Sequence, residues 1–440
     1  MNGNQEKKQR RDYPWRRWTR RLLLGVVCLA VLVGLAVAGV QWRADALLQR
    51  QLAAIRAKGE PVTPEELAAR HPAPPKEQDA AETYGRAGAL LKEAQNDDEY
   101  LARLKSVDDT GVRSRFEEGL FLWMEAYLAE HADSLGILLD AANQPAVRYN
   151  WSKSWDSPES NPDLGEIHEA ARLLRLEAFV AAEHGDAGRA MNAIVAALAM
   201  DRTLRDAPLT IMQMIRLALR SMTCQSIPRT LPLAGYSDEQ LLRLSRALTE
   251  TDDPEALANA FIAERAMGLQ GFERISGAAR LFLAASGARE RYMDYMTQLV
   301  EASRLPAPEA LERVEQLDRE THATSETLLP RLSNIFIPRL GGYILQLAES
   351  DAIIRCTQAA IAVERYKLAH GILPEIARDL VPEFLPGLPE DPFDGTPLHY
   401  FTDENGYSVY SIGADREDNG GMPIVTNREG DIVFRVERGE

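Results

Sequence analysis

The feature that most constrains this chain is an uninterrupted apolar run from Leu22 to Val40, nineteen residues without a charged side chain or a proline. As a helix that rises about 1.5 Å per residue, the run would cover about 28 Å, close to the roughly 30 Å hydrocarbon core of a bilayer. Trp42 follows at the far end, where amphipathic aromatic rings prefer the headgroup layer. The sequence therefore predicts a single transmembrane helix over residues 22–42.

Basic residues precede the apolar run and give it a direction. Residues 1–21 contain eight Lys or Arg and two Asp or Glu, a net charge of +6. Because basic flanks stay on the cytoplasmic side of a membrane, we expect residues 1–21 to be cytoplasmic and everything after Trp42 to be extracytoplasmic. The alternative is a cleaved secretory signal, since Ala36-Val37-Ala38 has the form of a cleavage site.

The rest of the chain is acidic. The total charge of −16 leaves −22 on residues 22–440 once the +6 of the first segment is taken out. Phosphate backbones would repel such a surface, so nucleic acid is not an expected partner. Three widely separated cysteines also exclude a disulfide framework and a structural zinc motif.

Residues 43–78 are expected to form a juxtamembrane helix and a proline-rich linker. Apolar residues recur at helical spacing from Arg43 to Lys58, and Gly59 would end that helix. Prolines then stand at positions 61, 64, 72, 74 and 75, where each removes a backbone donor. We expect this linker to hold the body off the bilayer.

Residues 79–349 read as successive amphipathic helices and predict an α-helical extracytoplasmic domain. Residues 167–184 and 187–202 form the clearest pair, joined by a turn at Gly185-Asp186. Small residues such as Ala190 and Ala197 make this pair similar to one unit of a tetratricopeptide repeat. Ser237 followed by Gln240 predicts a capping box at a later helix start.

Residues 350–440 change in character and predict a small α+β domain. An apolar helical pattern ends at His370-Gly371, where glycine is the usual residue for leaving a helix. Asn405-Gly406 then separates two runs rich in aromatic and β-branched residues, which predicts a hairpin. Residues 432–436 can add a third strand.

The order of motifs in this tail resembles the globular part of the major pseudopilin of type II secretion systems. The motifs, spread over about 85 residues, are Gly371-Ile372-Leu373-Pro374, Leu388-Pro389-Glu390-Asp391-Pro392-Phe393-Asp394-Gly395, Tyr410-Ser411-Ile412-Gly413-Ala414-Asp415 and Gly430-Asp431-Ile432. The leader that precedes the fibre-forming helix of that family is missing here. The whole layout is also similar to a group of bacterial single-pass membrane proteins, which implies the bacterial inner membrane as its location.

The resemblance to the pseudopilin implies a calcium ion in the last loop, with Asp415, Asp418 and Asp431 as its ligands. Calcium prefers six to eight oxygen ligands, and a loop that contains glycine can bend carboxylates and carbonyls around it. The alternative is a solvated acidic turn, in which Asp, Asn and Gly are favoured by turn geometry alone. No other cofactor is expected.

The sequence contains no familiar catalytic motif. It lacks a His-Glu-x-x-His pair, a Gly-x-Ser-x-Gly elbow, a P-loop and a dinucleotide fingerprint. We therefore expect a membrane-anchored extracytoplasmic interaction or scaffold protein, not an enzyme, with a protein or peptide partner. Two alternatives stay open: an accessory component of a type II secretion or pilus-like system, and a cell-envelope enzyme whose site carries no recognised motif.

Overall fold

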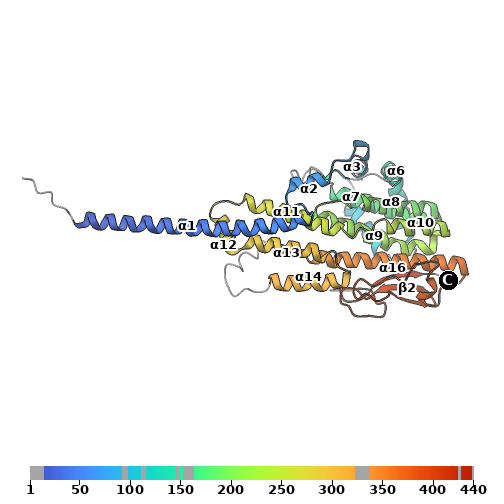
Figure 1. The fold of residues 1–440 in the computed structure, drawn as a ribbon. Coiled ribbons are helices and arrows are strands. Elements are labelled where there is room, and N and C mark those ends of the chain that lie inside the picture. Colours follow the sequence, from blue (N-terminus) through green and yellow to red (C-terminus); the bar gives the residue numbers. More distant parts are fainter. Residues whose placement is uncertain are drawn as a thin grey trace, which may run out of the picture.

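The computed structural model describes residues 14–91, 98–110, 115–144, 149–151, 163–322, 337–424 and 428–438. The described part of the chain is mainly helical, with a small sheet near its carboxyl end. Figure 1 shows one long helix, α1, projecting from an elongated body, with the carboxyl end of the chain at the opposite end of that body. The expected fold class, a mainly α protein with an apolar helix at its start and a small α+β tail, is confirmed at this level.

Helix α1 runs without interruption over 44 residues, Pro14–Ala57, about 66 Å of helix. Its apolar first part is exposed, with Leu22 70% and Leu35 64% accessible, and within the described residues it belongs to the one helix long and apolar enough to cross a membrane. Its last part is buried instead, because Leu48, Leu52 and Ile55 pack into the body. The apolar part of α1 is thus continuous with the folded body.

The segment after α1 is not a spacer. Gly59 ends the helix with a positive φ of 76°, as expected. Val62 and Leu67 are then buried in the same cluster as Ile55, and α2 (Pro64–Arg70) packs against α11. The prolines alone suggested an extended linker, but the apolar residues between them bring the chain back onto the body.

The body is built from helices that pack around three apolar clusters. Their bounds are α3 (Ala80–Leu91), α4 (Asp98–Asp109), α5 (Glu118–Glu130), α6 (Ala132–Ala141), α7 (Leu164–Glu183), α8 (Ala187–Thr203), α9 (Thr210–Ala234), α10 (Asp238–Thr249), α11 (Ala256–Arg274), α12 (Gly277–Ser286), α13 (Ala288–Ala302), α14 (Ala307–His322) and α16 (Gly342–His370), with short 3-10 turns at η1 (Lys76–Gln78) and η6 (Ala377–Leu380).

Two local predictions for the body are confirmed. Helices α7 and α8 form the expected pair, joined by the turn at Gly185, and they pack against each other. Small residues of the pair such as Ala190 are fully buried. Ser237 and Gln240 form the expected capping box at the start of α10. The likeness of the pair to a tetratricopeptide unit stays a prediction.

The tail forms an antiparallel three-stranded sheet in the order β1-β2-β3. The strands are β1 (His399–Asp403), β2 (Gly406–Ser411) and β3 (Ile432–Glu437), so the hairpin and the third strand appear where the sequence predicts them. Helix α16 ends at Gly371 with a φ of 76° and lies along the sheet (Figure 1).

The sheet shares its apolar core with the helical body. Tyr407, Val409 and Val436 belong to the same buried cluster as Leu198 of α8 and Leu241 of α10. Inside that cluster the Tyr407 hydroxyl donates to Glu364 of α16 over 2.8 Å. Tail and body therefore bury apolar surface against each other, and α16 contributes to both.

Candidate functional site

The three aspartates predicted to bind calcium lie in one loop, between β2 and β3. Asp418 is exposed and Asp415 is partly buried, whereas Asp431 is 1% exposed. Their carboxylates accept hydrogen bonds from backbone N–H groups: Asp415 from Gly430 and Asp431 from Gly421, both over 2.7 Å. The three residues thus lie in the same loop, and hydrogen bonds from backbone N–H groups to their carboxylates hold its two ends together.

These hydrogen bonds favour the charged form of the loop carboxylates. The Gly430 N–H lowers the pKa of Asp415, and the Gly420 N–H lowers the pKa of Asp418. Within the described residues no group of three or more His, Cys, Asp or Glu side chains is arranged to hold a metal ion. The calcium site stays a prediction, and the acidic-turn alternative accounts for the same contacts.

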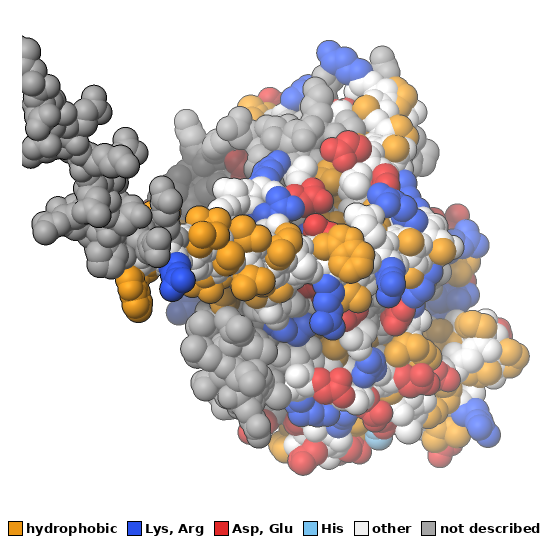
Figure 2. Space-filling model, turned by 60° about the vertical axis from the view of Figure 1, so that its left-hand side comes forward, with side chains coloured by type: hydrophobic (Ala, Val, Ile, Leu, Met, Phe, Trp, Pro, Cys, Tyr) orange, Lys and Arg blue, Asp and Glu red, His pale blue; other side chains and the backbone are white. Residues whose placement is uncertain are grey.

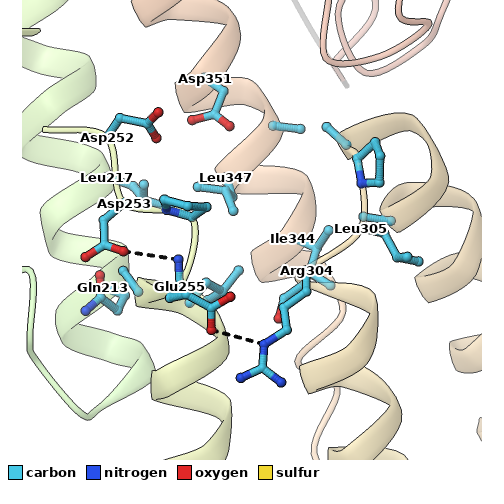
Figure 3. Close-up of a pocket in the computed structure, with 18 of the residues that line it drawn as sticks. Gln213, Leu217, Asp252, Asp253, Glu255, Arg304, Leu305, Ile344, Leu347 and Asp351 are labelled. Atoms are coloured by element: carbon cyan, nitrogen blue, oxygen red, sulfur yellow. Dashed lines mark hydrogen bonds and ion pairs between the residues drawn. The ribbon is translucent and has the colours of Figure 1, made fainter. Parts of the chain in front are cut away.

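A second acidic group lies elsewhere, in a cavity of about 260 Å³ between α9, α16 and the loops that precede α11 and α14. We call it the carboxylate pocket. Figure 3 shows Asp252, from the loop before α11, and Asp351, from α16, pointing toward each other across it. Its charged lining residues are Arg216, Arg220, Asp252, Asp253, Glu255, Arg304, Asp351 and Arg355.

One wall of the carboxylate pocket is a buried ionic cluster. Asp201 of α8 is completely buried and accepts from the Nε atoms of Arg216 and Arg220, each over 3.1 Å. Both guanidinium groups also donate to the backbone carbonyl of Thr251. Because one carboxylate faces two arginines, the cluster keeps one excess positive charge beside the pocket.

Most other charges of the pocket are already paired. Arg304 binds Glu255 over 3.0 Å and Glu60 over 2.8 Å, and Arg355 donates to the carbonyl of Glu390. Asp252 and Asp351 are the exceptions among the described residues, since neither side chain has a hydrogen-bond or ion-pair partner there. They are the groups of the pocket that remain free to act on a ligand.

Asp351 has the more unusual environment of the two. Its pKa is raised from 3.8 to about 6, mainly because the carboxyl is buried; Arg220 and Arg355 oppose the rise, and the neighbouring Asp252 adds to it. A carboxyl with such a pKa exchanges its proton near neutral pH, which is what general acid–base chemistry requires.

A mostly apolar cavity with a volume of about 760 Å³ lies beside the sheet. It is a groove between α9, α16 and β3, which we call the β3 groove. Leu217 and Pro228 line it from α9, Ile353 from α16 and Phe434 from β3. Within the described residues β2 pairs with one side of β3, and the other side carries only a bridge between Pro423 and Asp431.

Two of the three cysteines lie in the core of the body. Cys224 and Cys356 are 0% and 1% exposed, and burial raises the pKa of Cys224 to about 12. A thiol in that state does not form the reactive thiolate at neutral pH.

The sequence did not reveal the carboxylate pocket. Asp252 and Asp351 come from elements far apart in the chain, and no spacing rule connects them. One local signal was present: Arg216 and Arg220 stand four residues apart, on one face of a helix with apolar residues between them, and buried arginines need a buried anion nearby.

Comparison with known protein families, with curated proteins and with solved structures gives no match for this chain.

Proposed function

We propose that this chain is a membrane-anchored, extracytoplasmic scaffold protein that binds an extended segment of a partner protein in the β3 groove. The observation that carries the proposal is that β3 lines a largely apolar cavity and that, within the described residues, no second strand pairs with the side of β3 away from β2. In this proposal α1 crosses a bacterial inner membrane, residues 1–21 are cytoplasmic and the body is outside.

The unpaired side of β3 supports a peptide as the ligand. A strand at the edge of a sheet presents N–H and C=O groups that another extended chain can pair with, a common mode of peptide recognition. β3 has six residues, about 20 Å of strand, long enough to align a short peptide.

The charges near the groove support an uncharged peptide. Arg428 binds Glu349 over 3.2 Å, and Arg435 binds Asp403 over 2.6 Å. Since these described groups pair with each other, a charged partner segment would have to break one of these ion pairs to find a counterion. Apolar side chains would instead contact Leu217, Ile353 and Phe434.

Photo-crosslinking in intact cells tests the proposal. A photoreactive residue at Gln225, an exposed position of the groove wall, should give a discrete adduct. The same residue at Glu239, exposed on α10 and outside the groove, is the matched control. Ile353→Lys should abolish the Gln225 adduct, because a lysine in the groove would be left without a counterion.

The outcomes separate the candidate roles. Equal adducts at Gln225 and Glu239, or an adduct that survives Ile353→Lys, would contradict binding in the groove. If the crosslinked partner is a secretion component, the accessory role in a type II secretion or pilus-like system gains support over a general scaffold.

The carboxylate pocket favours a second candidate function, a cell-envelope enzyme. Asp351 would act as the general acid and Asp252 as the base, because their surroundings differ and one proton can be exchanged near neutral pH. An activity screen of the full-length protein against small envelope metabolites tests it. Turnover lost in both Asp351→Asn and Asp252→Asn would support it, and turnover that neither change affects would remove it.

A further inference from the structure

A third cavity lies where α1 meets the body, next to the expected membrane surface. It has a volume of about 430 Å³ and is enclosed by α1, the end of α11, α12 and the start of α13. We call it the interfacial cavity. Figure 1 shows α12 beside the middle of α1, and the two helices are in contact. Its polar and charged lining residues are Gln41, Asp45, Gln49, Glu273, Arg280 and Arg289.

The position of the interfacial cavity along α1 places it at headgroup depth. Gln41, which lines it, follows Val40, the last residue of the apolar run. Asp45 is four residues further, about 6 Å along the helix. A headgroup layer is about 5–7 Å thick on each side of the hydrocarbon core. Trp42, 75% exposed at this level, fits the same interface.

The exposed surface around α1 agrees with this placement. Figure 2 shows apolar side chains gathered along the projecting helix, with basic and acidic side chains mixed over the adjoining face of the body. The body thus begins where the apolar surface of α1 ends. If α1 spans a membrane, the interfacial cavity faces the lipid headgroups.

Among the described residues that line the cavity, one cation and one anion have no ion-pair partner in the structure, Arg280 and Glu273. Arg289 and Asp45 satisfy each other over 2.8 Å. Arg280 and Glu273 are exposed, and within the described part of the chain neither side chain has a partner. A ligand complementary to them carries a negative and a positive group, as a phosphate diester linked to an ammonium does.

We propose that the interfacial cavity binds the headgroup of a zwitterionic phospholipid, with its phosphate at Arg280 and its ammonium at Glu273. The proposal rests on membrane insertion of α1, which is part of the proposed function. The guanidinium would hold the phosphate by charge-assisted hydrogen bonds, and the amide groups of Gln41 and Gln49 would add neutral donors.

Native mass spectrometry of the full-length protein in detergent, with defined lipids added, tests the proposal. The wild type should retain phosphatidylethanolamine in preference to phosphatidylglycerol with the same acyl chains. Arg280→Ala should lower retention of phosphatidylethanolamine about tenfold, the loss expected for one charge-assisted contact. Glu273→Gln should remove the preference for ethanolamine over glycerol.

Arg274→Ala is the matched control. Arg274 is exposed at the end of α11, next to Glu273, but does not line the cavity. It should retain lipid as the wild type does. Wild-type retention by Arg280→Ala, or equal binding of the two lipids by the wild type, would overturn the proposal. Alkaline extraction of cell membranes distinguishes the failures: release of the wild type would refute the anchor itself, whereas a retained protein without lipid preference would refute only the headgroup site.

Discussion

Asp201 shows how a single carboxylate organises a buried part of this molecule. It is 0% exposed and lies between Arg216 and Arg220, each 2% exposed. Burying three charges costs desolvation free energy, and the cluster persists because each guanidinium also has the Thr251 carbonyl to donate to. The same cluster forms the wall against which Asp351 lies, so the ionic core and the carboxylate pocket depend on each other.

Replacing Asp201 should therefore be costly. Asp201→Ala leaves two buried arginines without an anion and should lower the free energy of unfolding by about 3–5 kcal/mol. Urea denaturation of detergent-solubilised protein measures this. Glu301→Ala is the control, because its partner Lys58 is about half exposed and such pairs contribute about 1 kcal/mol or less. Similar losses for both variants would contradict the role given to Asp201.

Asp351 should make stability depend on pH. Its folded pKa, about 6, lies above the ordinary value of 3.8, so between these values the folded state holds the proton more tightly. The free energy of unfolding should then fall as pH rises from about 4 to 6, by at most about 3 kcal/mol from this group. Asp351→Asn should be more stabilising at pH 7 than at pH 4. An effect of the same size at both pH values in urea denaturation would contradict the assignment.

At the level of elements, the sequence predicted those features that depend on interactions between residues close together in the chain. The apolar run, Gly371 at the end of α16 and Asn405-Gly406 in the hairpin each act within a few residues, and each appears as expected. The burial of Val62 and the meeting of Asp252 with Asp351 depend on elements distant in sequence. Those features required the packed structure, because no spacing along the chain encodes them.

Gly406 offers a test of the hairpin. Its φ is +148°, and a Cβ atom added there would lie 2.1 Å from the carbonyl oxygen of Val436 on β3. Gly406→Ala should therefore destabilise the protein by about 1–3 kcal/mol through strain and loss of strand pairing. Thermal unfolding checks it against Gly136→Ala, an exposed helical position with open space, which should raise stability by up to about 1 kcal/mol. An unchanged unfolding temperature for Gly406→Ala would contradict the predicted clash between position 406 and β3.

For the whole molecule, the decisive feature is that one uninterrupted helix, α1, joins the apolar segment to the body. Helix α1 carries exposed apolar residues at its start and core residues such as Leu52 at its end. Glu60 then binds Arg265 over 2.7 Å and Arg304 over 2.8 Å, which fastens the exit from α1 to α11 and to the end of α13. A membrane-inserted α1 would thus hold the body at a fixed height and orientation, with the β3 groove away from the lipid.

The side of the membrane on which the body resides is the central claim, and a pair of carboxyl-terminal fusions in cells measures it directly. One fusion carries alkaline phosphatase, which is active only outside the cytoplasm, and the other carries a fluorescent protein that matures only inside it. With the body outside the cytoplasm, we expect a membrane-bound, active phosphatase and no fluorescence. Fluorescence with an inactive phosphatase would place the body in the cytoplasm and contradict the proposed topology together with the function built on it.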